Sequence, residues 1–141
     1  MIDPAPPGRV VALDPGGARI GVAVSDSART MAFPRPSVAG GEGAASRCAA
    51  LAREEGARVL VVGHPLRLDG TPGAAAAEAV ALADELRADL DDEVDVVLHD
   101  ERLTTVTATT RLREAGVSAR EGRSRVDGAS AVVLLESWLA R

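Results

Sequence analysis

Two apolar runs near the start of the chain lie so close together that they must pair as antiparallel strands. Residues 10–14 form the first run, the turn residues Pro15, Gly16 and Gly17 follow it, and residues 20–24 form the second. A parallel pair would need a crossover of about a dozen residues or more, for which there is no room. A β-hairpin therefore opens the fold.

The segments that follow predict a mixed α/β sheet. Residues 31–38 contain two prolines and fit an edge strand, whereas residues 58–63 form the near-continuous apolar run typical of a strand buried on both faces. A fifth strand is expected at 94–99. Helices are expected at residues 43–56, 74–90, 105–115 and 125–139, and a mobile loop at 117–124. Three antiparallel strands followed by right-handed crossovers give a five-stranded mixed sheet with helices on both faces.

Length and composition limit the class of protein. A chain of 141 residues has room for one domain, which we place at 9–141 after a flexible N-terminal segment, 1–8. Phe33 and Trp138 are the only aromatic residues, which argues against a single-strand binder built on stacked bases. The start has no signal-peptide pattern and no later apolar run is long enough to cross a bilayer, so we expect a soluble, cytoplasmic protein without a membrane partner.

The single cysteine, Cys48, excludes an internal disulfide and a cysteine-based zinc site. It lies in an Ala-rich helical segment and is expected to be a buried, inert small residue. A reducing compartment fits this usage.

Charge is distributed unevenly along the chain. The net charge is −5, yet the stretch from 110 to 126 holds five arginines against two glutamates, a local balance of +3 that leaves −8 for the rest. All sixteen positive charges are arginine, because the chain has no lysine, and lysine catalysis is therefore excluded. The basic stretch fits a solvated helix and loop as well as it fits a phosphate-binding surface.

Three carboxylates lie beside apolar runs. Asp14 ends the first strand, Glu101 follows Asp100 at the end of the fifth, and Asp127 lies in the first turns of the last helix. Each alone fits a turn, a helix entry or a helix-dipole partner. The predicted topology, however, can bring all three together, and clustered carboxylates repel one another unless a cation offsets them. Oxygen ligands of this kind suit Mg²⁺ or Mn²⁺, and two such ions would activate a water and stabilise the leaving oxygen of a phosphodiester.

The other candidate residues fit structural roles better. His64 and His99 flank strand ends without a second zinc-ligand motif. The glycines around residues 63–73 do not form a phosphate-binding loop of the P-loop type, and no glycine-rich loop leads from a strand directly into a helix. Thr104 and Thr105 fit the cap of the expected helix at 105–115, and phosphate contact is the alternative.

Ordered motifs between Val10 and Leu139 resemble the YqgF family, whose members are described as Holliday-junction-resolvase-like and as nucleases that mature the 5′ end of pre-16S ribosomal RNA. The motifs are Asp14-Pro15-Gly16-x-x-Arg19-Ile20-Gly21-Val22-Ala23-Val24-Ser25-Asp26, Gly63-x-Pro65-Leu66-x-x-Asp69-Gly70-Thr71, Asp100-Glu101-Arg102-Leu103-Thr104-Thr105, Ala115-Gly116-Val117 and Asp127-x-x-x-Ala131.

The resemblance implies a ribonuclease-H-like fold with Asp14, Glu101 and Asp127 as the catalytic, metal-binding triad. It selects Glu101 over Asp100, a choice that the residues alone leave open. It implies phosphate contact or triad orientation for Arg19, Arg102 and Thr104. The lysines usual before the last aspartate are replaced by arginines that keep the charge and improve bidentate phosphate binding. These arginines are Arg120, Arg123 and Arg125.

Some positions depart from the family pattern. Ala18 stands where lysine is common, and Arg67 where asparagine is common, so either change would alter substrate contacts. After Asp127 the usual Leu-Ala-Ala reads Ala129-Ser130-Ala131, which removes some bulk from the helix.

The leading hypothesis is a metal-dependent nuclease that acts on precursor ribosomal RNA, with Mg²⁺ or Mn²⁺ as cofactor and with the arginines of the basic stretch holding the backbone. The first alternative is resolution of four-way DNA junctions, which a homodimer would favour over a monomer because paired cuts need two sites. The second is a nucleic-acid-binding regulatory protein without turnover. A nucleotide-binding domain of the actin or sugar-kinase kind shares this sheet but needs two such domains.

Overall fold

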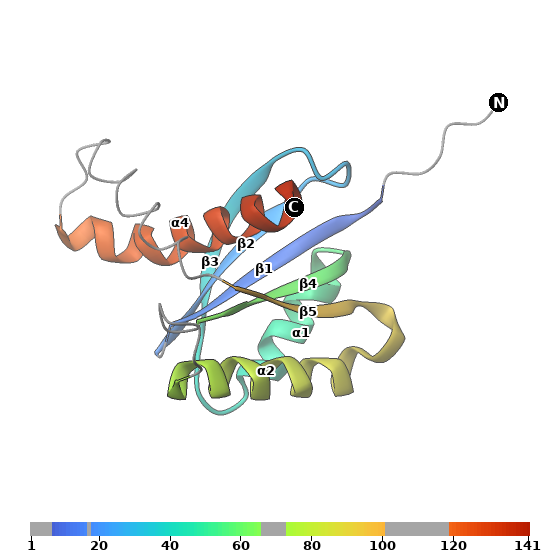
Figure 1. Ribbon diagram of the computed structural model, residues 1–141, viewed down its shortest axis with the longest axis horizontal. Coiled ribbons are helices and arrows are strands. Elements are labelled where there is room, and N and C mark those ends of the chain that lie inside the picture. The colour runs from blue at the N-terminus through green and yellow to red at the C-terminus, as the bar shows by residue number, and fades with distance from the viewer. Residues whose placement is uncertain (1–6, 17, 66–72, 101–118) are drawn as a thin grey trace.

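The computed structural model describes residues 7–16, 18–65, 73–100 and 119–141, with the backbone alone at 119–128. Within these ranges the chain forms five strands, three α-helices and a short 3₁₀ turn (Figure 1). The elements in chain order are β1 (Arg9–Gly16), β2 (Arg19–Ser25), β3 (Ala32–Ala39), α1 (Ala44–Glu54), β4 (Ala57–His64), α2 (Ala74–Leu90), η1 (Asp91–Glu93), β5 (Asp95–Asp100) and α4 (Ala119–Ala140).

The predicted sheet is confirmed in its topology. Its strand order is β3-β2-β1-β4-β5, with β1, β2 and β3 antiparallel and with β4 and β5 parallel to β1. The hairpin expected from the first two apolar runs is β1 and β2, in which Asp14 pairs with Gly21. The proline-containing strand, β3, lies at one edge of the sheet, as Pro34 and Pro36 require.

The position of strand β4 in the sheet explains why its sequence is continuously apolar. It lies between β1 and β5, and its side chains alternate between two separate cores. Leu60 and Val62 belong to the core under α1 and α2, whereas Val59 and Val61 belong to the core under α4. Both faces of the strand are therefore covered by helices, so neither set of alternate positions tolerates a polar residue.

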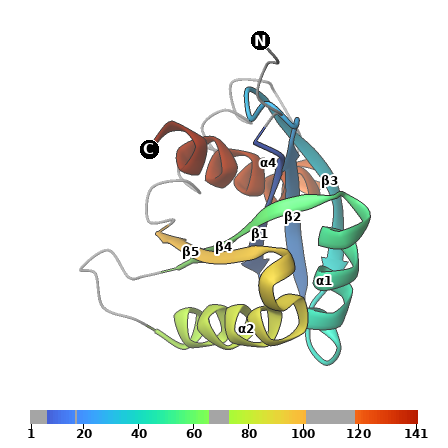
Figure 2. The ribbon, with the colours of Figure 1, turned by 90° about the vertical axis from the view of Figure 1, so that its right-hand side faces the viewer.

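The sheet separates two helical layers (Figure 2). Helices α1 and α2 cover one face, and among the described helices α4 alone covers the other, mainly over β1, β2 and β3. In β1 the odd-numbered side chains, Val11 and Leu13, face α1 and α2, and the even-numbered Val10 and Ala12 face α4. This alternation decides the face on which each polar residue of a strand emerges.

Strand β1 continues to Gly16, two residues beyond Asp14, where the sequence suggested that it would stop. Pro15 pairs with Ile20 of β2, but the pairing of β1 with β4 ends earlier, at Leu13 and Val62. Pro15 therefore lies where β1 pairs with β2 only. Its missing backbone N–H costs no hydrogen bond to a second neighbouring strand.

The last helix begins earlier than expected. The mobile loop predicted at 117–124 is wrong at residues 119–124, because α4 starts at Ala119 and not near Arg125. This part of the sequence has no apolar period, but alanine, arginine and glutamate are strong helix formers, and Glu121 precedes Arg125 by the favourable four-residue spacing. The expected helix at 105–115 lies outside the described residues, as do residues 1–6 and most of the loop after His64. Among the described helices, none is long and apolar enough to cross a bilayer.

Candidate functional site

The carboxyl ends of the three parallel strands form the candidate site. In the sheet register Leu13 of β1 pairs with Val62 of β4, and the next β4 residue, Gly63, pairs with His99 of β5. Asp14 therefore lies in the same row as His99, two strands away, which is about 10 Å at the usual strand spacing. The ends of β1 and β5 thus lie at the same edge of the sheet, with β4 between them.

Asp14 emerges on the face that α4 covers. It continues the even-numbered series of Val10 and Ala12, which pack beneath α4, and it is half-buried. Arg19 lies on the same face, because it continues the β2 series of Ala23 and pairs with Gly16 at the end of β1. Asp14 and Arg19, which flank the same turn in the sequence, therefore share one edge and one face of the sheet.

Strand β5 brings two polar residues to the same edge. His99 Nε2 lies 3.0 Å from Ser137 Oγ of α4, whereas Leu98 packs against the core on the opposite face. By alternation, Asp100 is on the side of Leu98 and points away from α4. Burial lowers the pKa of His99, and its hydrogen bond to a serine agrees with the structural role predicted for it. Sequence analysis did not find Ser137, because nothing in the spacing of the two residues signals the contact.

The remaining predicted site residues have no described side chains. Glu101, Arg102 and Thr104 lie outside the described residues. Asp127 lies within the backbone of α4, together with the predicted phosphate-binding residues Arg120, Arg123 and Arg125. Among the described side chains no group of three or more acids, histidines or cysteines is close enough together to hold a metal ion, but two members of the predicted triad are not among them.

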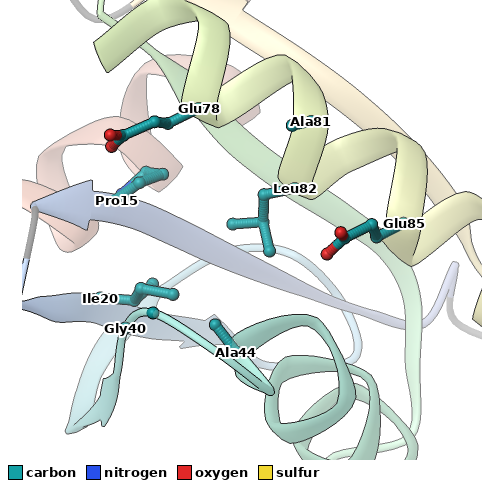
Figure 3. A pocket seen from close by; sticks show the side chains of 9 residues that line it. Pro15, Ile20, Gly40, Ala44, Glu78, Ala81, Leu82 and Glu85 are labelled. Carbon is teal, nitrogen blue, oxygen red and sulfur yellow. The ribbon is translucent and has the colours of Figure 1, made fainter. Parts of the chain in front are cut away.

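One cavity among the described residues lies on the other face of the sheet. It has a volume of about 460 Å³ between β1, β2 and α2, with Pro15, Ile20 and Leu82 along its apolar wall and Glu78 and Glu85 at its edge (Figure 3). Pro15 follows Asp14 directly but points to the opposite side of the sheet. This cavity is therefore separated from the carboxylate of Asp14 by the sheet itself, and we do not assign the chemistry to it.

Cys48 is excluded from the site by its position. The residue is fully buried in the core under α1, and burial raises the pKa of its thiol to about 11. The thiolate needed for nucleophilic attack is therefore scarce at neutral pH. The prediction that Cys48 is buried is confirmed, and the raised pKa agrees with an inert thiol.

Comparison with known proteins agrees with the fold and with the motifs. Residues 8–141 match the family model described as "RuvX: Holliday junction resolvase". Several relatives carry the name "Putative pre-16S rRNA nuclease". The one from Anaeromyxobacter sp. is 46% identical over 134 residues, covering 93% of this chain and 96% of that protein. The one from Thermobifida fusca is 47% identical over 137 residues, covering 92% and 85%.

Solved structures show the same fold at low sequence identity. The chain resembles T. thermophilus RuvC in complex with a Holliday junction substrate, with a TM-score of 0.56, 16% identity and 94% coverage of each chain. A second Thermus thermophilus RuvC structure gives a TM-score of 0.52 at the same identity. The predicted ribonuclease-H-like class is confirmed by this likeness and by the five-stranded mixed sheet.

Proposed function

This chain belongs to the family described as RuvX, Holliday junction resolvase, and on that premise we propose that it is a metal-dependent nuclease. Its substrate is proposed to be precursor 16S ribosomal RNA, after the name that its relatives carry. The observation that carries the proposal is Asp14, half-buried at the carboxyl end of a central strand on the face covered by α4. Residues 9–141 would form the single nuclease domain.

The direction of α4 supports a role for Asp127 beside Asp14. Trp138, near the end of α4, stacks with Arg29, and the Arg29 side chain donates a hydrogen bond to the carbonyl of Gly8, just before β1. From that anchor α4 runs back toward the carboxyl end of β1 (Figure 1). Residue 127 precedes Trp138 by eleven helical residues, about 16 Å, and would therefore lie toward the carboxyl end of β1.

The helix register supports the same assignment. Ala131 and Leu134 pack against the sheet, and Asp127 precedes them by four and seven residues, the spacing of one helix face. In the sequence, Arg123 and Arg120 precede Asp127 by the same four and seven residues, whereas Arg125 does not have this spacing. We propose that Arg120 and Arg123 contact phosphate near the triad and that Arg125 contacts more distant parts of the substrate.

The alternation of β5 supports the choice of Glu101. His99 contacts α4 and Asp100 lies on the other face, so a carboxylate from this strand end can reach the face of Asp14 only from the following residue. We therefore keep Glu101 as the second member of the triad, with Arg102 and Thr104 proposed to orient it or to contact phosphate.

The proposed donor set fits a hard divalent cation. Three carboxylates supply oxygen ligands only, as Mg²⁺ and Mn²⁺ prefer, and the mutual repulsion of the acids would be offset by the ion's charge. When bound, such ions activate a water and stabilise the leaving oxygen of a phosphodiester. Asp14, Glu101 and Asp127 would hold the ions, and Arg19, on the same face as Asp14, would bind the phosphate and orient it for attack.

Resolution of DNA junctions is the alternative that the comparisons favour, because the family description names it and because the related RuvC structure holds a Holliday junction. A homodimer would be required for paired cuts, whereas a monomer suffices to trim an RNA end.

The test offers the purified protein a 5′-extended 16S precursor RNA, a four-way DNA junction and a linear duplex, with Mg²⁺ and with a chelator. We expect metal-dependent cleavage of the RNA, and loss of cleavage in Asp14→Asn and Asp127→Asn. The matched control is Asp95→Asn, which removes an exposed carboxylate at the opposite end of the sheet. Cleavage of the junction alone would transfer the proposal to the DNA substrate, and metal-independent cleavage by Asp14→Asn would contradict the mechanism.

A further inference from the structure

The end of β5 is joined to α4 by a polar contact between residues far apart in the chain. His99 Nε2 and Ser137 Oγ are 3.0 Å apart, although 38 residues separate them in sequence. His99 is the penultimate residue of β5, and Ser137 lies in the last turn of α4. The contact therefore links the strand that leads into Glu101 with the helix that carries Asp127.

Packing alone holds this strand end weakly against α4. The apolar face of α4 rests mainly on β1, β2 and β3. Strand β5 lies at the edge of the sheet, where it pairs with β4 only. Among the described residues, Val97 is the β5 side chain that joins the core under α4, and it is only partly buried. A hydrogen bond at the end of such a strand therefore has a large influence on its distance from the helix.

We propose that Ser137 is a positioning residue of the nuclease site, which acts through His99 to set the distance between the end of β5 and α4. The inference rests on the proposed function, because it matters only if Glu101 and Asp127 share a metal ion. Mg²⁺ demands oxygen ligands in near-ideal octahedral geometry, so a small displacement of one carboxylate weakens its binding. Losing the contact would therefore weaken metal binding and slow cleavage without touching a phosphate-binding residue.

A merely structural hydrogen bond would behave differently. Ser137 is exposed, so water can replace its partner and the folded protein loses little stability. A structural role would thus appear as a small change in thermal midpoint, with cleavage per folded molecule unchanged. A positioning role would appear in kcat and in metal affinity at an almost unchanged midpoint.

The first test compares Ser137→Ala with the wild-type protein. We expect kcat on precursor RNA to fall about two- to tenfold, the range that the net free energy of one hydrogen bond allows, with KM for RNA unchanged. Calorimetric titration with Mn²⁺ alone, without RNA, should show weaker binding by a similar factor. Ser137→Thr, which keeps the hydroxyl, should restore both. The control is Ser46→Ala, the same change at an exposed position of α1 on the opposite face of the sheet.

The second test is a double-mutant cycle between Ser137→Ala and His99→Ala. If the contact carries the effect, Ser137→Ala should change nothing further in the His99→Ala background. Additive losses in the cycle, or a Ser137→Ala protein that matches wild type in kcat and in Mn²⁺ affinity, would overturn the inference. If Asp14→Asn still abolishes cleavage, either of these results leaves the proposed function intact. A wild-type protein that cleaves none of the substrates would contradict the proposed function itself.

Discussion

The two ends of the sheet use charged residues in opposite ways. At the amino end, opposite charges from neighbouring elements pair: Arg9 and Arg35 both bind Glu55, at 3.1 Å each, and Arg53 binds Asp89 and Glu93 at the ends of α2 and η1. At the carboxyl end, three carboxylates are instead proposed to share a divalent cation. Asp14 lies at the end of β1, and Glu101 and Asp127 are proposed to join it.

The charged residues at the amino end are expected to serve stability, and those at the carboxyl end are expected to serve function. Opposite charges that pair across element boundaries hold α1, α2 and the sheet together, so their removal should lower the free energy of unfolding. In the proposed site, acids brought to one edge would repel one another, and this repulsion would create a demand for a cation. The predictions that follow test this division, from the largest expected effect to the smallest.

Asp14→Asn should have the largest effect, and on activity alone. Metal ions supply several kcal/mol of transition-state stabilisation, so loss of one ligand should lower kcat/KM at least about a hundredfold. The free energy of unfolding should change far less than the activity, because Asn keeps the size and shape of the side chain. Steady-state cleavage assays and urea unfolding measure the two quantities. An unstable variant with full activity per folded molecule would reverse the comparison.

Glu55→Ala should do the opposite. Its carboxylate accepts from two arginines and is only 15% exposed, so its loss should cost about 1 kcal/mol of stability, near the upper end for surface ion pairs, with kcat unchanged. The neighbouring Glu54 is exposed and makes no ion pair in the described structure, so Glu54→Ala is the matched control. Equal midpoints in urea for the two variants would show that the ion pairs at this end contribute nothing.

Asp26 gives a smaller effect that depends on pH. Its carboxylate accepts hydrogen bonds from the Thr30 hydroxyl, at 2.6 Å, and from the N–H of Met31, at 2.9 Å, and these bonds lower its pKa below 3.8. A lowered folded-state pKa stabilises the protein above the unfolded value, and the stabilisation disappears as pH falls through the folded value. Asp26→Ala should therefore lower the thermal midpoint at neutral pH, and the difference from wild type should shrink below pH 3.8. A difference that is constant with pH would contradict this role.

Treatment with a thiol reagent should leave Cys48 unmodified in the folded protein. Its thiol is fully buried and has a pKa raised to about 11, so a thiol reagent at neutral pH should label it only after denaturation. Mass spectrometry after timed exposure to iodoacetamide measures the labelled fraction. Rapid labelling of native protein would show that the core under α1 opens readily.

The sequence alone predicted most of the sheet because its strands are bounded by clear signals. The apolar run before His64 predicts a strand buried on both faces, and the prolines at 34 and 36 predict an edge. It failed at the start of α4, because residues 119–124 favour a helix by intrinsic propensity rather than by an apolar stripe.

The candidate site was predictable only in part. The position of Asp14 before Pro-Gly marks a strand end, but its face depends on the register with α4. The choice between Asp100 and Glu101 likewise depends on which β5 side chains meet that helix. The contact of His99 with Ser137 arises from tertiary packing and has no local signal.

The most direct test of the central claim is to locate Mn²⁺ in crystals of this protein by its anomalous scattering. We predict a peak at the carboxyl end of β1, on the face covered by α4, bound by the side chains of Asp14, Glu101 and Asp127. The account would be contradicted if crystals at saturating Mn²⁺ showed no peak at this edge and placed the three carboxylates on separate surfaces.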